Sequence, residues 1–340
     1  MPMYKTKGVK AYQMWNNQSV EQDYAYDIDG NLLLDNTEYR IENVVEYYRQ
    51  PLLAMCNTIS ALSADWQNFV FLTDTHGSAN KQHSQAMAIY MLEHVPNIDF
   101  IHLNGDYSND SFDMTQYQTF MSPFLSRKTA NWTYAAHGNH ETYGSQASLA
   151  MPQIAEDFLL PKDNVHGNLA RMYYYFDNVA KKTRYLIINT SDSSAYSVSA
   201  TQRTWIEKNV ILPDTDWHLV VMGHVNLWDC GGITTQNENG AANIINAILN
   251  TNGNLVGYIC GHQHIDFVGN TGQIWQTTLM CDRFENTNYY QGYSYTERVA
   301  DTVNEQALSV VSINTKTRNV VVRRIGAGWQ TILESLHYTY

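Results

Sequence analysis

Cysteine is scarce in this sequence, and no two cysteines stand at metal-binding or redox spacing. The four that occur among the 340 residues are Cys56, Cys230, Cys260 and Cys281. Without a CxxC pair, neither a zinc knuckle nor a disulfide framework is indicated. We expect free, buried thiols, because unpaired cysteine usually packs as a small apolar side chain.

Long apolar runs are also missing. No apolar stretch reaches the roughly 18 residues that a membrane-spanning helix needs, and residues 1–10 lack the apolar centre of a signal peptide. These two absences predict a protein that stays in the cytoplasm of the cell producing it.

Positive charge is the third shortage. Lysine and arginine number 21 against 33 aspartates and glutamates, which gives a formal net charge of -12 at pH 7. A protein that coats nucleic acid needs a basic face, so this class of function is excluded. A phosphate-containing substrate remains open, because bound cations reverse the local field.

The first 65 residues carry no catalytic pattern. Asp29-Gly30 between apolar runs predicts a β-hairpin in residues 24–35. A calcium loop is the alternative, but Ala25 and Asn36 stand where that template requires acidic ligands. We therefore interpret this stretch as a turn.

Residues 41–59 have apolar side chains at helical spacing, with Pro51 expected to bend or divide the helix. We interpret residues 1–65 as an amino-terminal extension. It either packs on the rest of the chain or, the interpretation we slightly prefer, docks on a partner.

From residue 68 onward, apolar strands alternate with helices, and five strands run directly into polar clusters. The strands are predicted at residues 69–72, 100–103, 133–136, 217–222 and 255–260. The clusters that follow them are Asp74-Thr75-His76, Gly105-Asp106, Gly138-Asn139-His140-Glu141, Gly223-His224 and Gly261-His262-Gln263-His264. In an open α/β sheet, ligands gather at the carboxyl ends of strands, so we expect one shared site.

The donor atoms in these clusters indicate metal chemistry. Carboxylate and amide oxygens mixed with imidazole nitrogens suit Mn, Fe or Zn. Two acids, one amide and four histidines besides His140 are too many for one ion with an open position. Two ions about 3.5–4 Å apart would use them all, lower the pKa of a bridging water and clamp an in-line phosphoryl displacement.

Each cluster alone has a simpler explanation. Asp-x-His and Gly-Asp are common and mostly belong to turns, and Gly-His-x-His is only moderately specific. The occurrence of all five in this order, each after an apolar strand, is what favours a site over turn chemistry.

Together the five motifs resemble those of the calcineurin-like metallophosphoesterases, over residues 68 to about 325. The resemblance implies an α/β fold, a four-layer αββα sandwich of two mixed β-sheets flanked by helices. The ligands it implies for one divalent ion are Asp74, His76, Asp106 and His264, and those for the other are Asp106, Asn139, His224 and His262. His140 would lie beside the ions and donate a proton to the leaving oxygen.

The implied activity is hydrolysis of a phosphate mono- or diester by a hydroxide that bridges the two ions and attacks in line. The alternative is a structural or binding module on the same fold, in which the metals only hold loops together. A missing ligand would have indicated that alternative, and none of the family's ligands is missing from the five motifs.

Two positions depart from the family pattern. Asn109, with Asp110 beside it, stands where many members have a second aspartate, and Val225-Asn226 follows His224 where some members have a further histidine. The first departure leaves open which group orients the ligands, and the second leaves open whether the substrate preference differs from that of other members. Gln202-x-x-Trp205 resembles a helix that many members carry before the Gly-His strand.

Several segments outside the motifs also carry predictions. His83 and His137 lie near motif loops and are candidates to contact a phosphate, while residues 173–176 are predicted as a strand of the second sheet. Residues 286–295 are predicted as an irregular loop that lines the cleft.

The carboxyl end predicts a closing hairpin at residues 307–313 and 320–324, which divides the chain into 1–65, a catalytic domain at 66–328 and a tail at 329–340. This arrangement is similar to phosphoesterase modules of gut bacteria and their phages, some of them tail or virion components. The similarity implies incorporation in a virion, a cell-envelope phosphodiester as substrate, and a virion or tail protein or a second copy of this chain as the partner of residues 1–65.

Overall fold

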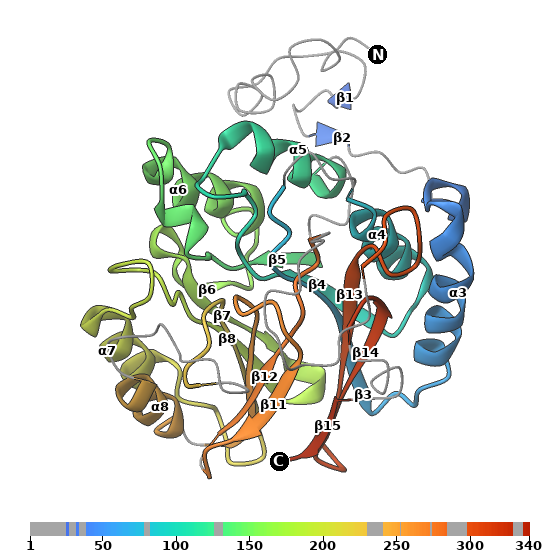
Figure 1. Ribbon diagram of the computed structural model, residues 1–340. Coiled ribbons are helices and arrows are strands. Elements are labelled where there is room, and N and C mark those ends of the chain that lie inside the picture. Colours follow the sequence, from blue (N-terminus) through green and yellow to red (C-terminus); the bar gives the residue numbers. More distant parts are fainter. Residues whose placement is uncertain are drawn as a thin grey trace.

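The computed structural model describes residues 25–26, 32–33, 39–77, 82–125, 132–229, 241–251, 253–272, 274–283, 298–328 and 336–340. Two β-sheets pack face to face, with helices on both outer sides (Figure 1). Their strand orders are β15-β14-β13-β3-β4-β5 and β11-β12-β10-β9-β8-β7-β6. Each sheet mixes parallel and antiparallel pairs, which confirms the predicted sandwich of two mixed sheets.

The first sheet contains β3 (Trp66–Leu72), β4 (Ile98–Leu103), β5 (Thr133–Ala135), β13 (Ala307–Asn314), β14 (Asn319–Gly326) and β15 (Leu336–Thr339). The second contains β6 (His166–Asn168), β7 (Tyr173–Asn178), β8 (Thr183–Ile187), β9 (His218–Met222), β10 (Asn254–Cys260), β11 (Phe267–Asn270) and β12 (Trp275–Thr278). All five predicted ligand-bearing strands are present, as is the predicted strand at residues 173–176.

The helices cover the outer faces of the two sheets. Those on the side of the first sheet are α3 (Glu46–Ser60), α4 (Ser84–His94), α5 (Met114–Leu125) and α6 (Ala147–Phe158), and those on the second are α7 (Ala200–Asn209) and α8 (Ala241–Leu249). Short 3-10 turns are η1 (Ile41–Asn43), η3 (His140–Thr142), η4 (Leu169–Arg171) and η5 (Val179–Lys181). No helix among the described residues is apolar over a membrane-spanning length.

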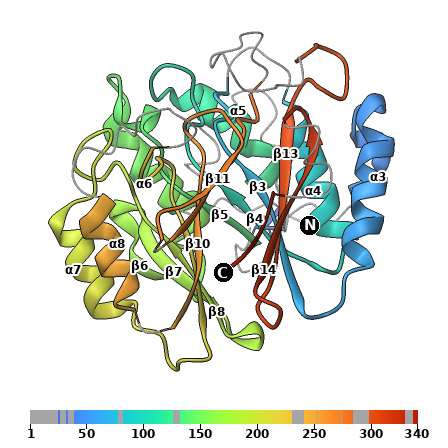
Figure 2. The same cartoon turned by 60° about the horizontal axis from the view of Figure 1, so that its bottom comes forward.

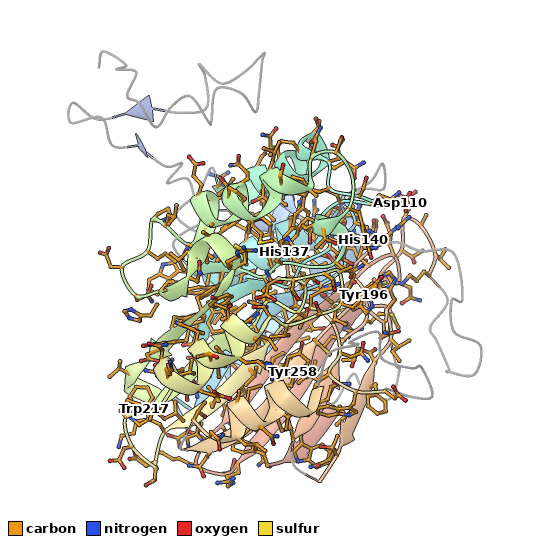
Figure 3. All side chains as sticks on the ribbon, turned by 90° about the vertical axis from the view of Figure 1, so that its left-hand side faces the viewer. Asp110, His137, His140, Tyr196, Trp217 and Tyr258 are labelled. Carbon is orange, nitrogen blue, oxygen red and sulfur yellow. The ribbon has the colours of Figure 1, made fainter. Side chains whose placement is uncertain are left out.

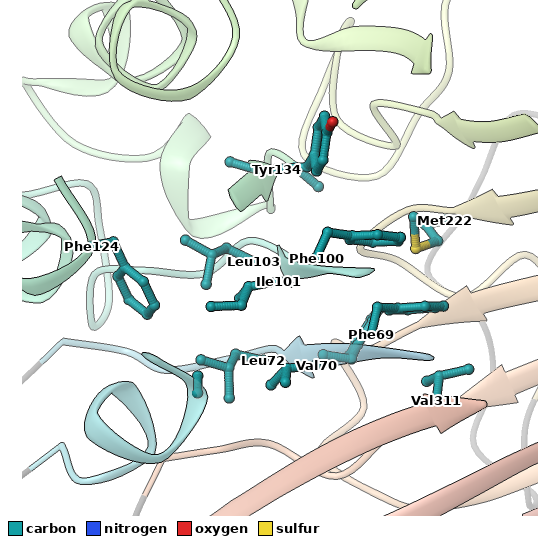
Figure 4. Close-up of a cluster of buried hydrophobic side chains, with 14 of the residues drawn as sticks. Phe69, Val70, Leu72, Phe100, Ile101, Leu103, Phe124, Tyr134, Met222 and Val311 are labelled. Carbon is teal, nitrogen blue, oxygen red and sulfur yellow. The ribbon is translucent and has the colours of Figure 1, made fainter. Parts of the chain in front are cut away.

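The space between the sheets is filled by apolar and aromatic side chains (Figure 4). Phe69 of β3 and Phe100 of β4 stack with ring centroids 4.6 Å apart, and Tyr185 of β8 meets both rings edge-on. Met222 of β9 belongs to the same cluster. The strands are apolar on both faces because each sheet is covered by a helix layer outside and by the other sheet inside.

The predicted amino-terminal helix is found as η1 and α3, and it runs through Pro51 without dividing. Its residues Tyr48, Leu52 and Ile59 are fully buried in the main core. The Tyr48 hydroxyl accepts the backbone N–H of Gln306 at 2.8 Å. The apolar face of this helix is therefore covered by the rest of the chain, and Figure 2 shows α3 alongside α4.

The remaining peripheral predictions fall partly outside the described residues. Strands β1 (Ala25–Tyr26) and β2 (Leu32–Leu33) pair antiparallel, which confirms the hairpin, while its turn lies outside the described part. The loop at 286–295 and Cys230 also lie outside it. Cys56, Cys260 and Cys281 are buried.

The closing hairpin of β13 and β14 is confirmed, with eight paired positions between Ala307 and Gly326. The segment predicted as a tail adds a further strand, because β15 pairs antiparallel with β14. Residues 336–339 are therefore part of the first sheet.

Candidate metal centre

The five predicted clusters meet at one edge of the sandwich, but they come from two sheets. Strands β3, β4 and β5 of the first sheet and β9 and β10 of the second all point their carboxyl ends to this edge. Figure 3 shows His140 and Asp110 at this edge and Trp217, which precedes β9, at the opposite end. The expected convergence is present, although a single open sheet does not produce it.

The backbone is strained at the points where the strands present these side chains. Asp74, His76, Asp106, His262 and His264 all adopt φ between 44° and 68°. This left-handed region costs a residue with a β-carbon about 1 kcal/mol or more. Such conformations persist where the surrounding structure fixes them, and they concentrate at functional sites.

One group of donor atoms contains Asp74, His76 and His264, all within 4.8 Å of one another. The Nε2 atom of His264 lies 3.2 Å from Asp74 Oδ1 and 3.2 Å from His76 Nε2. Ligands bound about 2.0–2.2 Å from one ion are separated by comparable distances. These atoms are therefore spaced as ligands of a single cation.

A second group contains Asp106, His224 and His262 within the same limit. His224 Nε2 lies 2.9 Å from Asp106 Oδ2, and it lies 3.6 Å from Asp74 Oδ1 of the first group. Asn139 is 2% exposed, and its Oδ1 has no hydrogen-bond partner among the described residues. A buried amide oxygen without a partner is costly unless a cation binds it, so the donor set fits divalent metal.

Hydrogen bonds behind the ligands hold their orientation. The Nδ1 atom of His224 lies 2.7 Å from Asn104 O, which directs Nε2 toward the carboxylates. Glu141 accepts the N–H groups of Asp106, Tyr107 and Gly138, each at 2.8 Å, and so ties the loops after β4 and β5 together. Such contacts fix the ring orientation of a histidine ligand and the position of a carboxylate ligand.

Glycine is required beside the second group. A β-carbon on Gly138 would lie 2.2 Å from Asp106 Oδ1 and 2.5 Å from the Asp106 backbone nitrogen. The Gly-Asn-His-Glu motif therefore begins with glycine because the two loops approach too closely for any side chain.

Burial and mutual contact shift the pKa values of these groups in opposite directions. Burial alone would raise the pKa of the Asp106 carboxyl, but His224 beside it holds that pKa well below its usual range. Burial lowers the pKa of His224, whereas Asp106 and Asp74 raise it more, to about 9. Burial, together with His224, lowers the pKa of His262 to about 3. A cation binding at His224 displaces a proton, so metal affinity should fall as the pH falls.

His140 stands at the open side of the site, and its side chain is 25% exposed. Its Nε2 lies 3.7 Å from Asp106 Oδ2, while its Nδ1 is hydrogen-bonded to the backbone carbonyl of Asn109. The same carbonyl lies 3.4 Å from Nδ1 of His76. Asn109 is the position at which the sequence departs from the family pattern. Because its main-chain oxygen orients both histidines, a carboxylate side chain is not needed there.

The two other histidines singled out from the sequence belong to neither donor group. His137 is fully buried, and burial lowers its pKa to about 3, so it stays neutral. His83 packs against Tyr47 and lies 3.8 Å from Glu305 on the side of α3.

A sixth polar cluster, which the sequence patterns did not single out, lies at the same edge. Strand β8 runs parallel to β9 and leads into Asn189-Thr190-Ser191-Asp192 and then Tyr196. The Tyr196 ring lies 5.6 Å from the ring of His262. The signal is the same as for the other five clusters, a buried strand followed by polar residues, but this cluster contains no histidine, and Asn, Ser and Asp are common turn residues.

Comparison with known proteins identifies the family. Residues 68–266, more than half of the chain, match the model of the calcineurin-like phosphoesterase family. No curated protein matches the chain.

Solved structures with a similar chain trace include a purple acid phosphatase from seeds of yellow lupin, Lupinus luteus, with 16% identity and a TM-score of 0.49. That match covers 78% of this chain but 52% of the lupin chain, so this chain spans about half of its length. The anchor in the inner membrane complex of Plasmodium matches with 13% identity and a TM-score of 0.49, over 77% of this chain and 84% of the other. The chain belongs to the calcineurin-like phosphoesterase family.

Proposed function

We propose that this protein hydrolyses a phosphate mono- or diester at a pair of divalent ions, Mn, Fe or Zn. The observation that carries the proposal is the position of Asp106 between donor atoms on two sides. Asp106 belongs to one group with His224 and His262, and a carboxylate oxygen of Asp106 also lies within 4.8 Å of ring nitrogens of His76 and His140. Its Oδ2 lies 2.9 Å from His224 Nε2. A carboxylate between two ligand groups can bridge two ions.

The two groups support the ligand sets that the family resemblance implies. Asp74, His76, Asp106 and His264 would hold one ion, and Asp106, Asn139, His224 and His262 would hold the other. Ions bound there would activate a water for in-line attack and neutralise the charge of the phosphoryl group.

His140 is assigned as the proton donor to the leaving oxygen. Its Nδ1–H donates to the carbonyl of Asn109, which turns Nε2 toward Asp106 and the ligand groups. Partial exposure lets the ring reach a substrate atom and exchange protons with solvent. A positioned histidine of this kind contributes about 10²–10⁴-fold to a rate. Similarity to gut-bacterial and phage modules favours a cell-envelope phosphodiester as the physiological substrate.

Chelation and reloading test the proposal. We expect p-nitrophenyl phosphate or bis(p-nitrophenyl) phosphate to be hydrolysed by protein loaded with Mn²⁺, activity to vanish after chelation and activity to return with Mn²⁺. Comparison of the two substrates separates monoesterase from diesterase activity. Full activity of rigorously metal-free protein would contradict the proposal, and no turnover by reloaded protein on any ester would favour a structural module.

A further inference from the structure

Two tyrosines outside the ligand set stand over the site and share a hydrogen bond. Tyr143 follows the Gly-Asn-His-Glu motif, and Tyr196 lies in the loop after β8. The Tyr143 hydroxyl donates to the Tyr196 hydroxyl at 2.9 Å. Both side chains are half-buried, and Figure 3 shows Tyr196 beside His140 at the ligand edge.

The pair spans the site from the proposed proton donor to a proposed ligand. The ring of Tyr143 lies 6.0 Å from the ring of His140, and the ring of Tyr196 lies 5.6 Å from the ring of His262. The two tyrosines therefore lie above the space in which a phosphoryl group would bind.

In the bond between the two tyrosines, Tyr143 is the donor, which leaves the hydroxyl proton of Tyr196 available. Tyr143 uses its O–H to donate, so the Tyr196 oxygen accepts and the Tyr196 O–H remains to donate elsewhere. No acceptor for this proton occurs among the described residues.

The loop that carries Tyr196 is closed by its own polar side chains. Ser191 Oγ donates to Ala195 O at 2.7 Å, and the hydroxyls of Ser194 and Ser197 lie 2.8 Å apart. The two ends of the loop are also held together, because Asp192 Oδ1 accepts the N–H of Ser199 at 2.6 Å. A loop held in this way presents its one aromatic residue in a set position before substrate arrives.

The helix after this loop fixes its start. Gln202 of α7 is fully buried, and its side chain bonds both backbone groups of Asn189, at 2.9 Å to the N–H and 2.8 Å to the carbonyl. These two bonds give the glutamine of the Gln-x-x-Trp stretch a structural role. They attach the start of the Tyr196 loop to helix α7.

Resting on the proposed function, we propose that Tyr196 donates a hydrogen bond to a non-bridging phosphoryl oxygen of the substrate, with Tyr143 holding its hydroxyl in place. Tyr196 is thus a substrate-binding residue, and Tyr143 is a positioning residue. The bond exists in the bound ester and in bound phosphate alike, so it contributes to affinity more than to the rate of the chemical step.

Tyr196→Phe tests this directly, because it removes the hydroxyl and keeps the ring against His262. Inorganic phosphate is titrated calorimetrically into Mn²⁺-loaded full-length protein, and KM and kcat are measured with p-nitrophenyl phosphate. We expect Tyr196→Phe to weaken phosphate binding and raise KM by about tenfold each with kcat nearly unchanged, as for loss of a hydrogen bond to a charged group. Tyr143→Phe should produce a smaller change, about threefold, in both quantities.

Tyr175→Phe is the matched control, since that tyrosine packs against Arg184 and Trp205 and not against a ligand. It should leave phosphate binding unchanged. If wild-type protein binds no phosphate, or Tyr196→Phe binds it as tightly as wild type, the inference is overturned. If phosphate binding depends on Tyr196 but no ester is hydrolysed, the inference stands and the proposed function fails.

Discussion

The two ends of the sandwich join the same two sheets by different means. At the carboxyl ends of the strands, charged and strained ligand residues from both sheets meet. At the amino ends, neutral groups make the connection: Gln67 Nε2 of β3 donates to Thr183 Oγ1 of β8 at 2.7 Å, and Tyr185 donates to Gln67 Oε1 at 2.8 Å.

This difference separates function from stability within one fold. The amino-end contact satisfies the Gln67 side chain inside the protein, which is how a buried polar group stabilises a fold. At the carboxyl end, no described residue bonds the Asn139 amide oxygen, and carboxylates lie beside imidazoles. Substitutions at the two ends should therefore have different consequences.

Removing helix α3, which is part of the main core, should have the largest effect on the protein. Deletion of residues 1–65 removes α3, whose Tyr48, Leu52 and Ile59 are buried in the main core. At about 1.5–3 kcal/mol for each buried apolar side chain, the loss is comparable to a typical domain's stability. We expect residues 66–340 to be unfolded or insoluble, as judged by expression and circular dichroism.

A shorter deletion provides the control. A protein starting at residue 39 keeps η1 and α3 and should remain folded. A stable, active protein comprising residues 66–340 would contradict this account and restore the interpretation of residues 1–65 as a docking arm.

At the carboxyl end, Asp106→Asn should have the greatest effect on activity. The substitution removes the charge of the one residue assigned to both ions, and we expect kcat to fall by about 10⁴-fold, which is roughly 5.5 kcal/mol. His76→Asn, which affects one ion, should cost less. Equal losses in kcat and metal content for the two variants would count against a bridging role for Asp106.

His140→Ala should separate proton donation from metal binding at the same end. Metal content should be nearly intact, whereas kcat should fall by about 10²–10⁴-fold for alkyl esters. The loss should shrink for p-nitrophenyl esters, because that leaving group needs little protonation. Loss of bound metal in this variant would make His140 a ligand.

At the amino end, Gln67→Leu should lower stability and leave the site unchanged. The substitution removes the acceptor of the Tyr185 hydroxyl, at a cost of about 1–3 kcal/mol, whereas Thr183 Oγ1 keeps its bond to Lys181 O. Urea unfolding measures this loss, while metal content and KM should stay at wild-type values. Adding Tyr185→Phe should cost less than the sum of the single changes, because it removes the stranded hydroxyl.

Sequence patterns predicted which polar clusters come together better than they predicted the framework that holds them. Buried strands that end in Asp74, Asp106 or His224 are visible as apolar runs followed by polar residues. Which sheet each strand joins is not encoded in such a run, so the motifs alone suggested one open sheet. The family resemblance supplied the two-sheet arrangement.

Other features could not be predicted because they depend on tertiary contact. The apolar stripe of residues 41–59 was evident from the sequence, but the sequence did not show that the rest of the chain covers this stripe. The main-chain carbonyl of Asn109 orients His140 regardless of its side chain, so residue identity at that position carried no signal. Tyr196 was overlooked because its polar loop has the composition of an ordinary turn.

The central claim is that two sheets together build one site for two ions. Metal content per chain, measured by mass spectrometry after loading with Mn²⁺ and removal of excess, tests it most directly. The account predicts two ions in wild-type protein, and about one in His264→Ala from the loop after β10 and in Asn139→Ala from the loop after β5. One ion or none in wild-type protein, or two ions in both variants, would contradict it.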